Sequence, residues 1–411
     1  MASYSAVVTT GIYCRPGCAA RPLAGNAQTF GLAAAAEAAG FRACHRCRPY
    51  RIAGPVGSNA PEIVCEAVQL IINGGLDDGG TEATLAERIG MSPRHLRRLF
   101  LRHLGASPSQ LARSRRAHFA RRLLDDTDLS VLDIAFASGF GSLRQFNRVM
   151  REVFRASPTD LRARRRRTDR LAADGGLALR LPVVPGYDWA AVQSFLAARA
   201  IPGVETVGGG IYRRAITVAD APGLLEVSGG KGEPCLLLRA HLPYWEGLIH
   251  VVERVATVLG TDSDHTVSTA APHADPGPGA PGAGHHGLAV PGAWDPFEAG
   301  VWAILAGGHP EPGQLLAEFV RHLGTAVPGL PAGLTHTFPD PATVTPHSLA
   351  SARLPEAEAA AVAALAATLV PGKHLQPEHW RPWLALGAAH LTARGILARD
   401  STAHATAAMR T

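Results

Sequence analysis

Four cysteines in two close pairs constrain this chain more than any other feature of its sequence. Three residues separate Cys14 from Cys18, two separate Cys44 from Cys47, and 25 residues lie between the pairs. Tetrahedral zinc takes four soft ligands from two short loops of this kind. So short a segment also needs a metal to supplement its small apolar core. We therefore predict a Zn2+ site formed by Cys14, Cys18, Cys44 and Cys47.

The compartment expected for the chain favours metal binding over disulfides. The first ten residues, MASYSAVVTT, lack the basic and apolar regions of a secretory signal. No stretch reaches the roughly 18 apolar residues of a membrane span. We therefore expect a cytoplasmic protein with no membrane partner. In the cytoplasm, six cysteines are better explained by metal binding or reactive thiols than by disulfides.

The positive charge of the chain is concentrated in its first part. Residues 1–168 contain 25 arginines, no lysine and 13 acidic residues, a net charge of +12, whereas residues 169–411 carry a net charge of −6. A general bias toward arginine would not confine the excess to one part. Such a distribution is typical of a surface that binds the DNA backbone. We therefore expect double-stranded DNA as a partner and a nucleoid-associated location.

A repeated helical unit strengthens the DNA-binding interpretation. Residues 85–108 are echoed by residues 134–158: in each copy an apolar-alanine pair is followed by a glycine turn and later by Ala-Ser-Pro. Ser92 and Ser142 are typical helix N-caps. Each cap precedes a helix of the kind that enters the major groove. The residues expected to face the groove are Arg94, His95, Arg97 and Arg98 in the first copy, and Arg144, Gln145, Asn147 and Arg148 in the second.

This repeated unit resembles the AraC-type DNA-binding domain. The resemblance covers residues 60–165 and includes the turn GFGS at residues 139–142. It implies an all-α domain with two helix-turn-helix motifs, which reach two successive segments of the major groove. A regulator of this type acts together with RNA polymerase, which we expect as a second partner.

The segments around the cysteine pairs resemble the N-terminal domain of the Ada family. The matching segments are TTGIYCRPGC at residues 9–18 and GFRACHRCRP at residues 40–49. The resemblance implies that Cys14 is both a zinc ligand and the nucleophile that accepts a methyl group from a methylphosphotriester in DNA. It also implies contacts with the DNA backbone, made by Thr10, Arg21 and Arg42.

The residues present suit this chemistry. Zinc keeps a bound thiol deprotonated at neutral pH, and the thiolate is the nucleophile. Four thiolates make the zinc site negative, and methylation of one of them reduces that charge, so binding to phosphates becomes tighter. The thioether product is stable, which predicts a single-turnover methyltransferase whose methylated form activates transcription. The alternative is a zinc site that is only structural.

The second half of the chain resembles DNA-3-methyladenine glycosylases of the AlkA type. Residues 178–262 mix strand-like and helical runs, which predicts an α+β unit. The motifs YDW at 187–189, FLAARA at 195–200 and YRR at 212–214 are similar to the N-terminal domain of that family. The match continues with VPGAWDPFEAGVWAIL at 290–305, which resembles the first helix of the glycosylase domain.

The last part of the chain departs from the AlkA pattern. The motif WRPW at 380–383 resembles the end of that family, but only residues 371–379 separate it from the preceding helical stretch, so the helix-hairpin-helix has no room. Between residues 306 and 399 the only aspartate is Asp340, which aligns with a loop well before the hairpin. Asp295 is the expected N-cap of the helix that follows it. We find no residue for the role of the glycosylase aspartate.

Together these observations predict a multidomain α+β protein in four parts. An Ada-type zinc and methyl-acceptor domain (1–52) precedes an all-α AraC-type DNA-binding domain (60–167), an α+β domain like the AlkA N-terminal domain (178–265) and a shortened all-α glycosylase-like domain (287–400). We predict an alkylation-damage regulator that binds promoter and alkylated DNA, accepts methyl groups and activates repair genes. Two alternatives stay open: an AlkA-type glycosylase fused to a regulator, and a non-catalytic AraC-type transcription factor that contains zinc.

Overall fold

A computed structural model describes most of the chain. The described residues are 3–18, 24–51, 60–77, 79–173, 175–184, 186–230, 234–261, 292–306 and 312–369. The chain forms two compact units: unit 1 comprises Met1–Val192 and Val227–Val290, and unit 2 comprises Gln193–Glu226 and Pro291–Thr411. None of the described helices is long and apolar enough to cross a membrane. The four domain borders expected from the sequence stay a prediction.

The cysteine-containing segment folds as a small mixed sheet with one helix. The strand order is β3-β1-β2-β4; β1 is antiparallel to β2 and β3, and β2 is parallel to β4. Helix α1 is almost entirely alanine, which favours a helix and allows close packing. The bounds are β1 Tyr4–Val7, β2 Ile12–Cys14, η1 Ala24–Asn26, β3 Ala27–Phe30, α1 Ala33–Ala38, β4 Arg42–Ala43 and η2 Pro49–Arg51.

The helical repeat predicted from the sequence is present. The hydroxyls of Ser92 and Ser142 cap the second helix of each copy, α4 and α7, and accept backbone N–H groups at 3.3 and 3.2 Å. We refer to α4 and α7 as the reading helices. Each ends in a residue of left-handed conformation, Gly105 in the first copy and Arg155 in the second. The bounds are α2 Glu62–Ile72, α3 Glu82–Arg88, α4 Pro93–Leu104, α5 Pro108–Asp126, α6 Val131–Ala137, α7 Leu143–Phe154 and α8 Pro158–Ala163.

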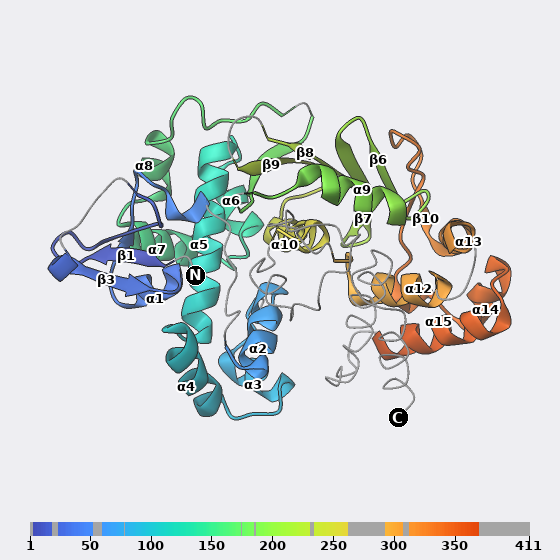
Figure 1. The fold of residues 1–411 in the computed structure, drawn as a ribbon, viewed down its shortest axis with the longest axis horizontal. Coiled ribbons are helices and arrows are strands. Elements are labelled where there is room, and N and C mark those ends of the chain that lie inside the picture. Colours follow the sequence, from blue (N-terminus) through green and yellow to red (C-terminus); the bar gives the residue numbers. More distant parts are fainter. Residues whose placement is uncertain are drawn as a thin grey trace, which may run out of the picture. The chain divides into compact units, whose positions relative to one another are not determined.

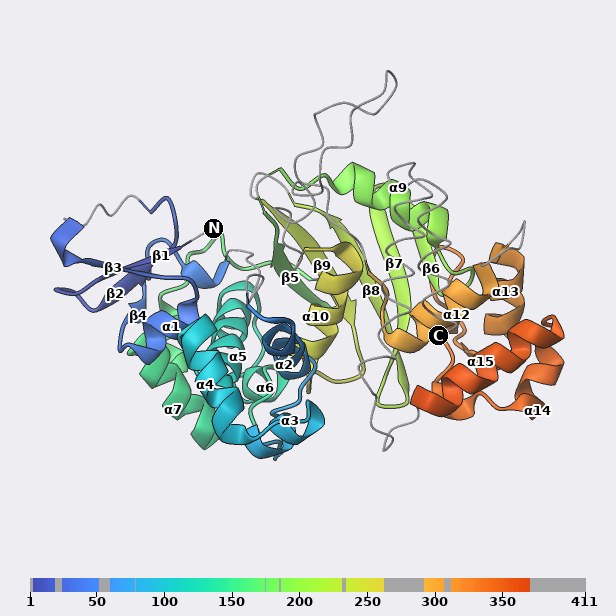
Figure 2. The same cartoon turned by 60° about the horizontal axis from the view of Figure 1, so that its bottom comes forward.

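Helix α5 is the centre of unit 1. A capping box at Ser107 fixes its start, and it runs for 19 residues. Figures 1 and 2 show the cysteine-containing strands on one side of α5, and β5 (Leu177–Pro182), β9 (Cys235–His241) and α10 (Leu248–Leu259) on the other. The apolar core that α5 forms with α2, α3 and α4 also includes Ala34 of α1. The cysteine-containing segment therefore shares a core with the first helix-turn-helix motif.

Helix α10 packs on the DNA-binding part of unit 1 through charged side chains. His250 Nε2 lies 2.6 Å from a carboxylate oxygen of Asp77, which also pairs with Arg116 of α5. Glu253 of α10 pairs with Arg115 of α5 and lies 3.7 Å from His250 Nδ1. Burial by itself lowers the pKa of His250, but the bonds to Asp77 and Glu253 raise it to about 9. Burial raises the pKa of Asp77, but the contacts with His250 and Arg116 lower it by more. The pKa of Asp77 therefore lies below its ordinary value.

We expect the contact between His250 and Asp77 to be lost at high pH. Because the pKa of His250 is raised on folding, its contribution to stability is full below the ordinary value of 6.5 and disappears as pH rises through about 9. The contribution of Asp77 to stability is present above its ordinary pKa of 3.8, so it is unchanged between pH 7 and pH 10. Replacing His250 by glutamine should lower the free energy of unfolding by about 1–3 kcal/mol at pH 7 and by little at pH 10. Urea unfolding at both pH values measures this, and an equal loss at both would contradict it.

A five-stranded sheet confirms the α+β character expected for residues 178–262. Its strand order is β5-β9-β8-β7-β6. In unit 1, β5 and β9 are antiparallel with Leu179 opposite Leu238, and in unit 2, β6 and β7 are antiparallel with Val207 opposite Tyr212. Strand β8 contains the border between the units. The bounds are α9 Trp189–Arg199, β6 Glu205–Gly208, β7 Ile211–Val218 and β8 Ala221–Gly229.

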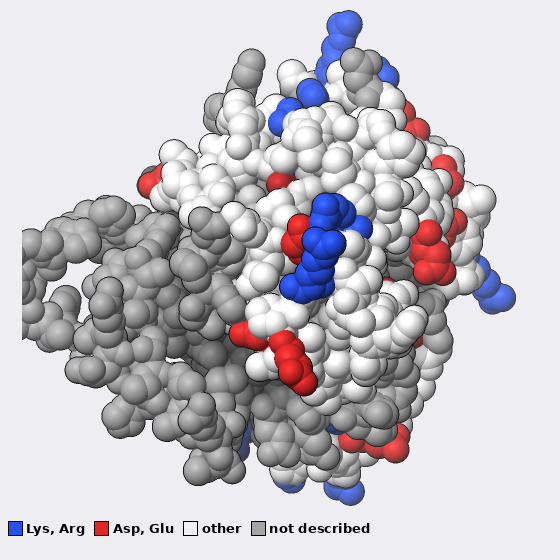
Figure 3. Space-filling model, turned by 90° about the vertical axis from the view of Figure 1, so that its right-hand side faces the viewer, with Lys and Arg blue, Asp and Glu red and all other residues white. Residues whose placement is uncertain are grey.

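Unit 2 has its own apolar core, to which Phe297 of α12 and Phe319 of α13 contribute. Arg214 is buried between Glu205 and Glu298, so both carboxylates have a charged partner. The face of the molecule in Figure 3, on the side of α13, α14 and α15, carries scattered acidic and basic side chains and no continuous basic track on its described part. The bounds are α12 Pro296–Ala306, α13 Pro312–Leu323, β10 Thr325–Ala326, β11 His336–Thr337, η3 Pro341–Thr343, α14 Pro346–Leu349, η4 Ala350–Ala352 and α15 Glu356–Leu369.

Candidate zinc centre and DNA interface

The pairing of β2 with β4 brings the two cysteine pairs together. These strands are parallel neighbours, so Cys14 at the end of β2 and Cys44 directly after β4 lie side by side. The N–H of Cys44 donates to the carbonyl of Tyr13 at 3.0 Å. A tight turn returns Cys18 to the site, where its N–H donates to the carbonyl of Arg15 at 3.3 Å. The sulfur atoms of four residues all lie within 4.8 Å of one another: Cys14, Cys18, Cys44 and Cys47.

This arrangement fits zinc. Burial raises the pKa of the Cys14 thiol, and burial raises that of Cys47 to about 12. Burial also acts to raise the pKa of Cys44, but hydrogen bonds from the backbone N–H groups of Cys47 and Arg46 lower it by more, so the pKa of Cys44 is lowered. A cation is therefore needed to hold Cys14 and Cys47 as thiolates at neutral pH, and four sulfur ligands complete a closed tetrahedral zinc site. The four cysteines form a zinc site, as the sequence predicted.

The residues predicted to contact the DNA backbone near the cysteines differ in exposure. Thr10 is exposed, whereas Arg42 is half-buried and donates to the carbonyl of Ala43 at 3.1 Å. Arg21 lies outside the described residues. Two exposed arginines inside the cysteine loops, Arg15 and Arg46, were not predicted as contacts. Their position between the ligands was the available signal, because it puts a cation in each loop that carries the sulfurs.

The reading helices expose six of the eight side chains expected to face the groove. Their apolar faces are buried through Leu96 and Phe100 in α4 and Phe146 in α7. Of the eight predicted contacts, the exposed ones are Arg94, His95, Arg97, Arg98, Arg144 and Arg148, and the half-buried ones are Gln145 and Asn147. The charge of α4 and α7 is thus directed to solvent, as a DNA-binding surface requires.

Polar contacts orient some of these side chains before DNA is bound. Arg98 lies 2.9 Å from the ring nitrogen Nδ1 of His95. Arg148 pairs with Glu152 at 2.8 Å, and Glu152 in turn pairs with Arg113 of α5 at 3.3 Å. A guanidinium held in this way has fewer conformations to lose when it enters a groove.

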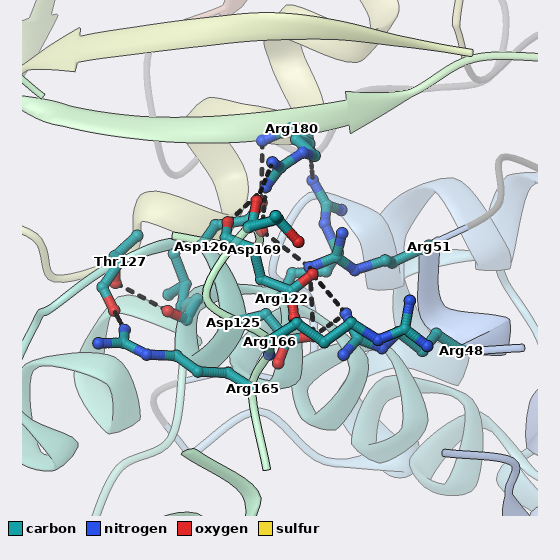
Figure 4. Close-up of polar contacts among 12 residues, drawn as sticks. Arg48, Arg51, Arg122, Asp125, Asp126, Thr127, Arg165, Arg166, Asp169 and Arg180 are labelled. Carbon is teal, nitrogen blue, oxygen red and sulfur yellow. Dashed lines mark hydrogen bonds and ion pairs between the residues drawn. The ribbon is translucent and has the colours of Figure 1, made fainter. Parts of the chain in front are cut away.

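A buried ionic cluster joins the zinc domain to the end of α5 (Figure 4). Asp125 of α5 is fully buried. It accepts hydrogen bonds from the hydroxyl of Tyr50 at 3.0 Å and from Arg51 at 3.3 Å, and it pairs with Arg121 one turn earlier on its own helix. Tyr50 and Arg51 lie just beyond the last zinc ligand, so the cluster anchors the end of the zinc domain.

The same cluster extends to the segment that follows α8 and to β5. Arg48 has a left-handed backbone with φ of 50°, is 8% exposed and pairs with Asp169 at 2.7 Å. Asp126 pairs with Arg51 at 3.0 Å and with Arg180 of β5 at 2.8 Å. These interdomain partners were not predicted, because nothing local in the sequence marks two residues about 75 positions apart as a pair.

The two aspartates considered for base excision are helix caps. Asp295 Oδ1 accepts the N–H of Glu298 at 2.9 Å at the start of α12, which confirms the predicted capping role. Asp340 Oδ1 accepts the N–H of Ala342 at 2.7 Å and caps η3. The predicted lack of a hairpin and the WRPW motif fall on residues 371–383, which lie outside the described residues.

Three parts of the chain match known families. Residues 2–50 match the metal binding domain of Ada, residues 85–164 a helix-turn-helix domain and residues 178–295 the AlkA N-terminal domain. The probable bifunctional transcriptional activator/DNA repair enzyme AlkA of Mycobacterium tuberculosis is 36% identical over 378 residues, which cover 89% of this chain and 74% of that protein. The bifunctional transcriptional activator/DNA repair enzyme Ada of Escherichia coli is 35% identical over 135 residues, 32% of this chain and 37% of its own length. The solved structure of a methylated N-Ada/DNA complex is 36% identical, covers 28% of this chain and 85% of its own, and has a TM-score of 0.12.

Proposed function

Because the chain belongs to the family of Ada- and AlkA-type bifunctional transcriptional activators and DNA repair enzymes, we propose that it transfers a methyl group from a DNA methylphosphotriester to Cys14 and then activates repair genes. The observation that carries this proposal is the environment of Cys14. Its sulfur belongs to the four-thiol cluster, and Arg15 and Arg46 are exposed within the same loops. A nucleophilic sulfur among cations suits an electrophilic carbon that is attached to a phosphate.

The transfer requires few groups. Zinc, when bound, keeps the thiols deprotonated at neutral pH. The Cys14 sulfur attacks the methyl carbon in line with the ester oxygen, the S–C bond forms, the C–O bond breaks, and the phosphodiester leaves as an anion. No proton moves, so no general base is needed. We propose that the exposed Arg15 and Arg46 neutralise the negative charge that the phosphate regains. The thioether is stable, so each chain reacts once.

Methylation changes the charge that the zinc domain presents to DNA. Four thiolates outweigh the two positive charges of zinc, and methylation of Cys14 removes one negative charge. Repulsion from the phosphates falls, and the affinity for DNA rises. The methylated protein then stays on promoter DNA through its reading helices, where we propose that RNA polymerase is its partner. Such a protein acts at the nucleoid in the cytoplasm.

Mass spectrometry of the intact, zinc-loaded chain tests the methyl transfer. The chain is incubated with DNA that contains methylphosphotriesters, or with unmethylated DNA of the same sequence as the control. One added methyl group, mapped to the peptide of Cys14, is the expected result. No added methyl group, despite bound zinc and intact DNA binding, would leave the non-catalytic zinc-containing regulator as the better description.

We expect the reading helices to contribute strongly to the salt dependence of DNA binding. Each phosphate contact by a cation adds about 0.9 to the slope of log K against log salt concentration. Replacing one exposed arginine in each helix by alanine, Arg94 in α4 and Arg144 in α7, should therefore reduce the slope by about 2. Titrations of a DNA duplex over a salt series measure this slope. Arg321→Ala, an exposed change on α13 of unit 2, is the control; an equal effect there would contradict the assignment.

For the glycosylase-like part we propose a role in folding or DNA contact and not in base excision. Base excision needs a carboxylate that is free to stabilise a sugar cation and activate water. Asp295 and Asp340 are the only aspartates among the described residues 292–369, and both are engaged as caps. Release of free 3-methyladenine from alkylated DNA by the full chain would instead favour a glycosylase fused to a regulator.

A further inference from the structure

Three side chains from three elements meet between the zinc site and helix α5. Tyr13, the residue before Cys14, is fully buried, and its hydroxyl donates to Oε1 of Glu37 on α1 at 2.6 Å. The same oxygen lies 2.7 Å from Nε2 of His118 on α5. The side chains of Glu37 and His118 are only 9% and 16% exposed, so water competes little for these bonds. The triad therefore links the backbone beside the nucleophile to the central helix of the DNA-binding domain.

The contact continues from His118 to the second reading helix. The His118 ring lies 5.9 Å from the ring of Phe154, the last residue of α7, and 6.4 Å from the ring of Tyr50. Phe154 is fully buried and packs edge-on against Tyr50 at 5.9 Å. An unbroken series of contacts thus runs from the neighbour of Cys14 to the C-terminal end of α7.

Helix α1 and the turn after it also touch the ends of both reading helices. Gly105 ends α4, and a Cβ added there would come within 3.0 Å of the Ala35 methyl on α1. Arg155 ends α7 and donates to the carbonyl of Gly40 at 3.5 Å. Gly105 and Arg155 occupy equivalent positions of the helical repeat. The zinc domain is therefore in contact with the same point of both copies.

We propose that Tyr13, Glu37 and His118 are positioning residues that hold the zinc site in a fixed relation to α7. Because they do so, methylation of Cys14 strengthens the binding of DNA by the reading helices. This inference rests on the proposed function and adds the route by which the zinc domain reaches the reading helices. A domain that is merely tethered must be ordered when DNA binds, which costs affinity, whereas a docked domain is already ordered by folding. Glu37 is the central group, because one of its oxygens bonds to both other residues.

The experiment compares the methylated and unmethylated forms of each variant. Wild type, Glu37→Ala, Glu37→Gln and His118→Ala are loaded with zinc, and half of each sample is methylated to completion, as checked by mass spectrometry. The Kd is measured for a duplex selected from a random-sequence pool by methylated wild type. The readout is the Kd of the unmethylated form divided by the Kd of the methylated form. A change that only destabilises the fold weakens both forms and leaves this ratio unaltered.

We expect Glu37→Ala and His118→Ala to lower the ratio by about fivefold or more. Glu37→Gln should keep it within about twofold of wild type, since the amide oxygen still accepts both bonds. Glu62→Ala, an exposed change on α2, removes the same charge and should leave the ratio unchanged. His118→Ala changes no residue of the zinc domain and decides the matter if Glu37→Ala does not fold.

A ratio equal to that of wild type in both alanine variants would overturn the positioning role. A wild type that takes up no methyl group would overturn the proposed function, and the positioning role with it. A fall in the ratio with normal methyl uptake supports both. The three results are distinct, because methyl uptake is recorded for every sample before its affinity is measured.

Discussion

Replacement of Cys14 by serine is expected to reduce methyl uptake from methylphosphotriester DNA below detection. A serine hydroxyl stays protonated at neutral pH and is a weak nucleophile without an adjacent base. The other three cysteines keep their sulfurs within the cluster, so the variant should still bind zinc, with lower affinity. Its affinity for DNA should be the same before and after exposure to damaged DNA, because no methyl group is added and the charge of its site does not change. Peptide mapping and a DNA titration before and after incubation measure the two effects.

The matched control for this variant is Cys65→Ser. Cys65 is a half-buried thiol on α2, outside the zinc cluster, so its replacement removes a sulfur without touching the site. It should take up one methyl group, on Cys14, as wild type does. Methyl groups found on Cys18, Cys44 or Cys47 instead, in wild type or in either variant, would show that Cys14 is not the acceptor. Uptake by Cys14→Ser at the rate of wild type would contradict the assignment equally.

Replacement of Asp125 by alanine is expected to lower the free energy of unfolding by about 3–5 kcal/mol. Asp125 is 0% exposed and bonds to Tyr50, Arg51 and Arg121. Its loss leaves the Arg121 side chain, which is 3% exposed, without this buried partner. A buried charge that loses its partner keeps the cost of desolvation and loses the attraction that offset it. Urea unfolding of the full chain, followed by circular dichroism, measures the change.

Asp128→Ala is the control for this prediction. Asp128 lies three residues further along the chain and pairs with Arg165 and Arg170, but its side chain is 48% exposed. Solvent screens such pairs, so the change should cost about 1 kcal/mol or less. Asp125→Asn should fall between the two, because its amide oxygen still accepts one hydrogen bond. Equal costs for the two alanine variants would show that water reaches the Asp125 cluster.

Local patterns in the sequence were sufficient for the zinc ligands and the reading helices. The spacing of Cys14 and Cys18, and of Cys44 and Cys47, predicts a metal site because loops of two or three residues present both sulfurs to one ion. Ser92 and Ser142 predict where α4 and α7 begin, since a serine hydroxyl satisfies the free N–H groups of the first turn. These signals act within a few residues and depend little on what packs around them.

The resemblance to known families predicted the order of the parts but not how they pack. Glu37 and His118 are 81 positions apart, and His250 and Asp77 are 173 apart. A glutamate on an alanine-rich helix and a histidine on a basic helix both read as solvated side chains in isolation. Which carboxylate is buried against which histidine depends on the faces that α1, α5 and α10 turn toward one another.

The zinc ligands, the two helix-turn-helix motifs and the family follow from the order of the amino acids alone, because short-range spacing, capping and charge carry them. The three-dimensional fold adds that the zinc domain shares a core with the first motif and is joined to α5 by the Asp125 cluster and by Glu37 and His118. Burial and pairing are properties of surfaces that meet in space. A charged side chain is tolerated in such an interface only where a side chain of another element pairs with it. The local sequence does not identify that partner.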